Sequence, residues 1–293
     1  MPRQIEKKSK MQIIITPGTL YIVPTPIGNL SDISARALDV LKEVDLIAAE
    51  DTRHTSRLLS HYSISTKTIS MHDHNEAARS KQLTSKLLEG QSIALVSDAG
   101  TPLISDPGFI FVRDCREQGI PIIGLPGPCA LTTALSASGL PTDKFIFHGF
   151  LPAKQQAKVH ALKLLTNSGC TTVFYEAPRR IRDTVAACDE SLQDDHEIVL
   201  AKEISKTFET YKQGKAKDIL AWLDADAVHQ KGEFVLMIYC PNNLQSDGAS
   251  QEALALLALL AKELPLKKAA AITAAHYGLK KNALYAIGLD TLK

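Results

Sequence analysis

The stretch at residues 92–108 reads S-I-A-L-V-S-D-A-G-T-P-L-I-S-D-P-G, and the rest of the chain repeats its pattern. Its apolar run Ile93–Val96 predicts a buried strand. The strand must end in the polar turn that follows, because Gly100 permits positive φ and Pro102 has no N–H for a ladder. A Pro-Gly pair then precedes a predicted helix at 109–118. Ligands bind at the carboxyl ends of strands in open α/β sheets, so this turn predicts a binding loop. The alternative is an ordinary connection whose Asp and Ser residues cap the helix.

Strands and helices alternate on both sides of this stretch. Strands are predicted at 19–24, 46–49, 68–71, 93–96 and 120–125, with amphipathic helices in between, the first at 34–44 behind an N-cap at Ser31 or Asp32. This alternation is typical of a mostly parallel sheet with helices on both faces. The sequence therefore predicts the α/β class.

Four of the predicted strands end in loops that are rich in polar side chains. These loops read T-P-I-G-N-L-S-D, E-D-T-R-H-T, H-D-H-N-E and S-D-A-G-T-P-L-I-S-D-P-G. Because parallel strands bring their carboxyl ends to one edge, the loops should converge on one crevice. His72 and His74 flank Asp73 in the third loop, but their spacing favours ordinary loop histidines, and we expect no metal site.

The chain divides into four parts by pattern. We expect a disordered basic N-terminus at 1–18, an α/β domain at 19–127, a second α/β domain at 128–241 and a helical appendage at 242–293. The junction is placed at the stiff turn L-P-G-P-C-A, and a polar linker precedes the appendage. A helix-turn-helix in the appendage is possible, but the pattern favours generic helical packing.

Composition indicates a soluble protein of ordinary type. The 293 residues have a formal net charge of +1, which excludes a strongly basic footprint over the whole protein but not a local basic patch. No stretch approaches the ~20 apolar residues that a membrane helix needs, so no membrane partner is expected. The five cysteines form no C-x-x-C pair, and we expect a reducing cytoplasm.

Several common enzyme classes lack their motifs here. The sequence has no Walker A loop, no G-x-G-x-x-G, no H-E-x-x-H and no G-x-S-x-G. Arg179, Arg180 and Arg182 cluster after a predicted strand, which suits either phosphate binding or a solvated helix start.

A specific resemblance rests on eight runs in order over residues 19 to 240. They are V-P-T-P-I-G-N-L-S-D, A-A-E-D-T-R-H-T, H-D-H-N-E, V-S-D-A-G-T-P-L-I-S-D-P-G, L-P-G-P-C-A, F-Y-E-A-P-R-R, A-K-E-I-S-K-T-F-E and K-G-E-F-V-L. The chain resembles the ribosomal RNA small subunit methyltransferase I family of the tetrapyrrole methylase superfamily, the class III methyltransferases. The resemblance implies two α/β domains with S-adenosylmethionine between them, and a homodimer. It implies methylation of the ribose 2′-hydroxyl of a cytidine in the decoding region of 16S rRNA.

The resemblance also carries cofactor positions onto this sequence. The superfamily's glycine-rich first loop is replaced by T-P-I-G, and Thr101 stands where the superfamily's G-D-P triplet has its acid. The expected cofactor-binding residues are Pro26, Gly100, Thr101, Leu103, Ile104, Cys129, Ala130, Tyr175, Glu176 and Ser205.

A ribose hydroxyl must lose its proton during methylation, so a general base is useful. Candidates are Glu50, Asp51, His74, Asp98 and Lys206, of which Asp98, Glu50 and Lys206 are taken as catalytic. Expected RNA contacts are Arg53, His74, Arg179, Arg180, Arg182 and Lys202. Two alternatives stay open: a tetrapyrrole methylase of the precorrin type, and an RNA-binding relative without catalysis. The absent glycine-rich loop argues against the first, and the intact D-A-G-T-P turn against the second.

Overall fold

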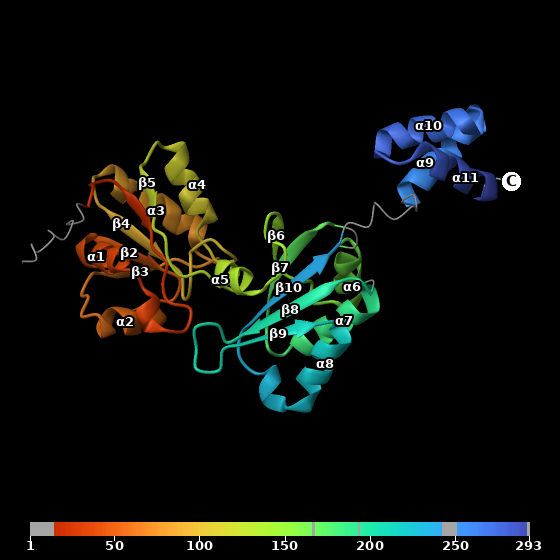
Figure 1. Ribbon diagram of the computed structural model, residues 1–293. Coiled ribbons are helices and arrows are strands. Elements are labelled where there is room, and N and C mark those ends of the chain that lie inside the picture. The colour runs from red at the N-terminus through yellow and green to blue at the C-terminus, as the bar shows by residue number, and fades with distance from the viewer. Residues whose placement is uncertain (1–14, 166–167, 193, 242–250, 292–293) are drawn as a thin grey trace, which may run out of the picture.

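A computed structural model describes residues 15–165, 168–192, 194–241 and 251–291. The expected disorder at 1–18 therefore falls almost wholly outside the described residues, as does the linker before the appendage. Figure 1 shows two α/β units followed by a group of helices.

The first sheet is parallel throughout and has the strand order β3-β2-β4-β1-β5. Its strands are β1 (Leu20–Ile22), β2 (Leu46–Ala49), β3 (Thr68–Ser70), β4 (Ile93–Val96) and β5 (Ile122–Gly124). The strand order reverses beside β1 and β4, which is where an open α/β sheet forms a crevice.

Helices cover both faces of this sheet because its strands are apolar on both sides. Ala94 and Val96 of β4 pack with α1 (Ala35–Glu43) and α2 (Thr52–His61). Ile93 and Leu95 face the other way, toward α3 (Glu76–Leu88) and α4 (Phe109–Glu117). This two-sided burial of one strand is typical of parallel sheets.

The second sheet is mixed, with the order β6-β7-β10-β8-β9. Strands β6 (Phe145–Phe150) and β7 (Cys170–Glu176) are parallel, whereas β10 (Phe234–Cys240), β8 (Glu197–Lys202) and β9 (Thr210–Gly214) pair antiparallel. Helices α6 (Gln155–Lys163), α7 (Ile181–Ser191) and α8 (Ala216–Ala225) contribute to the core on one face. Helix α5 (Ala130–Ala137) packs on the other face.

The last three helices form a cluster of their own. Helices α9 (Gln251–Glu263), α10 (Leu266–Tyr277) and α11 (Lys281–Thr291) share a small core that includes Leu257, Ala270 and Leu284. Figure 1 shows them apart from both sheets. No helix within the described ranges is both long and apolar enough to cross a bilayer.

The predicted α/β class with a helical appendage is confirmed, but two local predictions were wrong and one strand was missed. The E-D-T-R-H-T segment is not all loop, since α2 begins at Thr52 with Asp51 as its N-cap. The expected N-cap at Ser31 or Asp32 is instead Ser34, which follows a 3₁₀ turn at Leu30–Asp32. Strand β9 was missed because T-Y-K-Q-G has no apolar run. A second 3₁₀ turn at Ala227–Gln230 leads toward β10.

Candidate functional site

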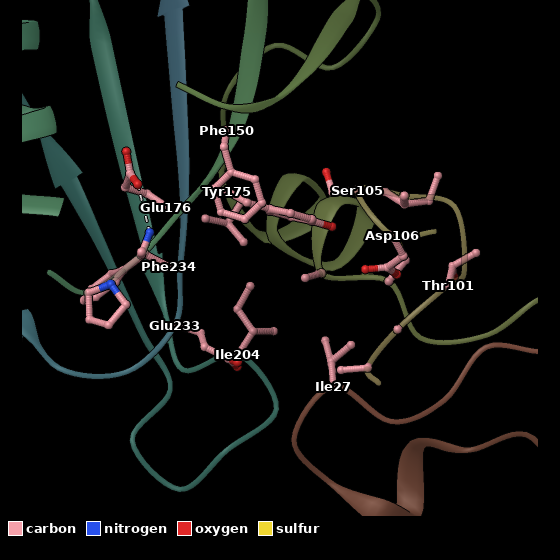
Figure 2. Close-up of a pocket in the computed structure, with 18 residues that line it drawn as sticks. Ile27, Thr101, Ser105, Asp106, Phe150, Tyr175, Glu176, Ile204, Glu233 and Phe234 are labelled. Atoms are coloured by element: carbon pink, nitrogen blue, oxygen red, sulfur yellow. Dashed lines mark hydrogen bonds between the residues drawn. The ribbon is translucent and has the colours of Figure 1, made fainter. Parts of the chain in front are cut away.

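A cavity of about 360 Å³ lies between the two sheets. Three parts of the chain line it: the loops of the first sheet, the start of α5, and the ends of β7 and β10. Figure 2 shows Ile27 and Thr101 on one side of the cavity and Tyr175 and Phe234 on the other. Its volume is within the ordinary range of small-molecule sites.

The turn after β4 supplies the first wall through its backbone. Thr25 and Gly100 exchange two hydrogen bonds, with N···O distances of 2.9 and 3.0 Å, which tie the first loop to this turn. The turn has φ values of +83° at Gly100, +71° at Leu103 and +74° at Ser105, a region that L-residues seldom adopt. Such outliers persist only where the surrounding structure holds them.

The second sheet supplies an aromatic and apolar wall. The ring of Tyr175 contacts Phe147 and Phe150 edge-on, with centroids 4.9 and 6.0 Å apart. Its hydroxyl accepts a hydrogen bond from the backbone N–H of Leu131 at 3.2 Å, near the start of α5. Burial raises the pKa of Tyr175, so the phenol stays protonated at neutral pH.

Asp106 is an acid inside the cavity that sequence reasoning left out of the site. Burial raises its pKa to about 6, a hydrogen bond from Ser97 opposes this, and the charges of Glu50 and Asp98 add to it. The sequence signal for Asp106 was its place in the same polar turn as Asp98. Other residues missed in the lining are Ile27, Ala99, Ser105, Phe150, Ala177, Pro178, Ile204, Glu233, Phe234 and Val235.

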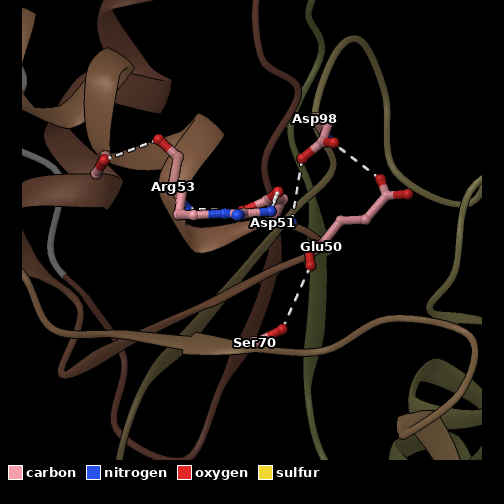
Figure 3. A network of polar contacts seen from close by, with 6 residues as sticks. Glu50, Asp51, Arg53, Ser70 and Asp98 are labelled. Carbon is pink, nitrogen blue, oxygen red and sulfur yellow. Dashed lines mark hydrogen bonds and ion pairs between the residues drawn. The ribbon is translucent and has the colours of Figure 1, made fainter.

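Glu50 and Asp98 are linked through backbone hydrogen bonds at the carboxyl ends of β2 and β4 (Figure 3). Glu50 Oε2 accepts from the N–H of Asp98 at 3.3 Å, and Asp98 Oδ1 accepts from the N–H of Asp51 at 3.1 Å. Burial raises the pKa of Glu50, with further contributions from neighbouring acids. Asp51 differs, because its hydrogen bonds with Arg53 lower its pKa to about 2.

Lys206 is unsuited to act as the base in this arrangement. Its Nζ contacts Glu203 Oε1 at 2.8 Å and Glu233 Oε2 at 2.7 Å. Burial works against the charge, but these two hydrogen bonds outweigh it and raise the pKa of Lys206. The stem of Lys206 lies against Gly28, where a Cβ would come within 2.5 Å of its Cγ. Lys206 thus connects the loop after β8 to the first loop.

Seven of the ten expected cofactor residues line the cavity: Gly100, Thr101, Ile104, Cys129, Ala130, Tyr175 and Glu176. The other three lie elsewhere. Pro26 lines a second cavity, Leu103 packs against the core of the first sheet beside Gly108, and the Ser205 hydroxyl donates to Asp32.

Four of the six expected RNA contacts are ion-paired or buried. Arg53 pairs with Asp51 at 2.9 Å. Arg180 pairs with the buried Glu176 at 3.1 Å, and Arg182 pairs with Asp224 at 2.7 Å. Lys202 is only 5% exposed, too buried to reach a phosphate without rearrangement. Arg53 and Arg182 are exposed despite their ion pairs, and the remaining two residues, His74 and Arg179, are also exposed.

The second cavity, of about 230 Å³, lies on the other side of the Thr25–Gly100 bridge. Its lining includes Asp98 and, from α2, Thr55 and Arg57. Within the described ranges, no group of three or more His, Cys, Asp or Glu side chains could hold a metal ion.

Comparison with protein families agrees with this geometry. Residues 19–220 match the family described as Tetrapyrrole (Corrin/Porphyrin) Methylases. Residues 247–293 match a family described as the RsmI C-terminal HTH domain. The preference for generic packing in the appendage is corrected by this match.

Curated relatives cover nearly the whole chain. A ribosomal RNA small subunit methyltransferase I of Vibrio cholerae serotype O1 is 53% identical over 273 residues, covering 93% of this chain and 95% of the relative. Its namesake from Escherichia coli O157:H7 is 52% identical with the same coverage.

Solved structures share the fold at low identity. A uroporphyrin-III-C-methyltransferase from Thermus thermophilus has a TM-score of 0.52 at 18% identity, covering 78% of this chain and 98% of its own. A diphthine synthase has a TM-score of 0.58 at 14% identity, covering 76% and 90%. These two likenesses bear on the fold alone. The family match and the curated relatives lead to one conclusion: the chain belongs to the ribosomal RNA small subunit methyltransferase I family of the tetrapyrrole methylases.

Proposed function

We propose that the chain methylates the ribose 2′-hydroxyl of a cytidine in the decoding region of 16S rRNA, within the small ribosomal subunit. The observation that supports this most is the 52–53% identity, over 93% of the chain, to enzymes named for methylating small-subunit ribosomal RNA. The chain is a methyltransferase, and its family uses S-adenosylmethionine.

The cavity between the sheets fits this cofactor. Ile104, Ile204 and Val235 offer apolar surface for an adenine ring, and the backbone at Gly100 approaches without a side chain. The Asp106 carboxylate faces the same space and would stabilise a sulfonium cation. When bound, S-adenosylmethionine supplies an electrophilic methyl group. The remaining expected contacts, with Cys129, Ala130 and Tyr175 prominent, belong to the same proposal.

The protein's own task is to position the hydroxyl and accept its proton. Positioning alone can remove several kcal/mol from a barrier, on the order of 7 in favourable cases. Asp98 is the proposed base, since its carboxylate lines the cavity next to the cofactor cavity. Glu50 supports it by accepting a hydrogen bond from the Asp98 N–H. Lys206, held between two carboxylates, serves the junction of the two units instead.

Three exposed side chains are proposed to bind RNA phosphates. Arg53 and Arg179 are exposed on different units, and His74 lies on the loop after β3. Arg180 and Arg182 act through Glu176 and Asp224, so their proposed role becomes the positioning of the loop after β7.

The assembly and location are also proposals. Strand β6 is an edge strand whose Phe145 and Ile146 are 44% and 48% exposed, which supports a homodimer covering this edge. All five cysteines are free thiols, which supports a cytoplasmic location. We retain 19–127 and 128–241 as the proposed domains, with 242–293 as the appendage.

Alkaline cleavage tests the reaction. A methyl on the 2′-oxygen removes the nucleophile that alkali needs, so the modified linkage resists cleavage. RNA from cells lacking this protein should gain one cleavable position in the small-subunit RNA. Purified protein with S-adenosylmethionine should restore protection on isolated subunits. Methylation of a base atom, or of a precorrin in place of RNA, would refute the proposal. We expect a short naked oligonucleotide to be a poor substrate, since a near-neutral protein must recognise shape.

A further inference from the structure

The second cavity is bounded by the first loop, the end of β4 and the first turns of α2. The backbone bridge between Thr25 and Gly100 separates it from the cofactor cavity, because Thr25 lines the second cavity and Gly100 lines the cofactor cavity. Its apolar lining comes from Pro26, Leu30 and Leu58. A space of about 230 Å³ with apolar sides and a few polar groups suits one flat heterocyclic ring and little more.

Thr55 gives this cavity an unsatisfied polar group. The residue is 3% exposed, and its Oγ1 has no hydrogen-bond partner among the residues that the structure describes. An unpaired buried hydroxyl costs free energy, and such groups are rare in native structures. Thr55 lines the cavity, but its Oγ1 has almost no accessible surface there, so a ligand supplies the missing partner only after a neighbouring group shifts.

Arg57 adds a second group of complementary chemistry. It follows Thr55 on α2, it is exposed, and it makes no ion pair with any residue in the described ranges. Its guanidinium offers a planar fork of N–H donors. The Watson–Crick edge of cytosine presents two adjacent acceptors, O2 and N3, which match such a fork. Uracil has an N–H at position 3, which opposes it.

We propose that this cavity receives the cytosine base of the nucleotide to be methylated, turned out of the RNA stack. The Thr55 hydroxyl forms a hydrogen bond with the base, and Arg57, at the mouth of the cavity, selects cytosine over uracil. Enzymes that act on one nucleotide commonly extrude it and read its Watson–Crick edge. With the base in this cavity, the ribose lies beside the Thr25–Gly100 bridge, and its 2′-hydroxyl reaches the methyl group past the end of that bridge. The inference rests on the proposed ribose methylation and assigns the base to a place in the fold.

Thr55→Val tests the floor of the cavity. Valine keeps the shape and removes a hydroxyl that has no partner in the free protein, so stability should hold or rise. The KM for unmethylated small subunits should rise about 5-fold, the worth of one hydrogen bond. The affinity for S-adenosylmethionine, measured by calorimetry, should not change. Thr172→Val is the matched control, because its Oγ1 is also buried and unpaired but it lines neither cavity.

Arg57→Lys tests the mouth while keeping the charge. Subunits carrying uridine in place of the target cytidine measure the preference of the enzyme. The preference of the wild type for cytidine should fall about 10-fold in the variant, as expected when a bidentate contact is lost. The salt dependence of subunit binding should be unchanged. Arg36→Lys on α1, an exposed arginine outside both cavities, should leave all of these values as in the wild type.

The outcomes separate the two proposals. If the wild type fails to protect any ribose on subunits, the proposed function is wrong and the base site with it. If the wild type methylates but Thr55→Val and Arg57→Lys both match it in KM and base preference, only the base site is wrong. A rise in KM for Thr55→Val that Thr172→Val shares would also overturn the base site, since it would be a general effect of core substitution.

Discussion

The two sheets contribute to the cofactor cavity in different ways. The first sheet is parallel, so its strand ends gather Glu50, Asp98 and Asp106 at one edge, and Asp106 lines the cofactor cavity. The second sheet is mostly antiparallel, and it offers apolar and aromatic surface such as Tyr175 and Phe234. The comparison teaches that parallel order concentrates ionisable groups, whereas the antiparallel sheet forms a wall against which a ligand can pack.

The largest expected effect is on the first sheet. Gly100→Val places a β-branched residue at φ +83° and a Cβ 3.3 Å from Ile27 Cγ2, so the turn must move. We expect cofactor binding to become undetectable by calorimetry while the circular dichroism spectrum persists. Gly119→Val is the control, since Gly119 has φ +70° with no atom near its Cβ position and lies outside the cavity. Equal loss in both variants would assign the effect to backbone strain alone.

The next largest effect distinguishes the roles of two neighbouring arginines after β7: Arg180 is expected to stabilise the fold and Arg179 to bind RNA. Arg180→Ala leaves the carboxylate of Glu176, whose side chain is 0% exposed, without its ion pair. Removing one partner of a buried pair destabilises by about 3 kcal/mol, which denaturant titration measures. Arg179→Ala should leave stability unchanged and reduce the salt slope of subunit binding by about 1. If Arg180→Ala weakened RNA binding without any loss of stability, the positioning role would be wrong.

Asp106 gives the first wall a pH dependence. Its raised pKa means that the folded state disfavours the ionised carboxylate. The ionised carboxylate therefore lowers the free energy of unfolding by its full amount above pH ~6, and this loss fades as the pH falls toward the ordinary pKa of 3.8. Asp106→Asn should therefore raise the midpoint of thermal unfolding at pH 8 and hardly change it at pH 4. The same variant should weaken cofactor binding at pH 8. A stability gain that is equal at both pH values would contradict this origin.

The two walls also differ in how much the sequence could predict. The polar loops of the first sheet are local, so D-A-G-T-P and E-D-T-R-H-T could be assigned to one edge from strand alternation. Phe234 and Val235 were not predicted as lining residues, because their position depends on β10 lying between β7 and β8, and no local sequence pattern encodes that strand order. The ion pair between Arg182 and Asp224 joins residues that are 42 apart in the sequence, so local pattern could not predict it either.

The smallest effect concerns a polar group on the second wall. Tyr175→Phe removes the acceptor for the Leu131 N–H near the start of α5, a bond of 3.2 Å. We expect a loss of about 1 kcal/mol in the free energy of unfolding and a change below about 3-fold in cofactor affinity. Tyr239→Phe, on the same face of the sheet but with no hydroxyl hydrogen bond in the described residues, should change neither. Denaturant titration and calorimetry on both variants measure this difference. If Tyr175→Phe abolished cofactor binding at unchanged stability, the hydroxyl would bind the ligand directly, and the second wall would be as chemically active as the first.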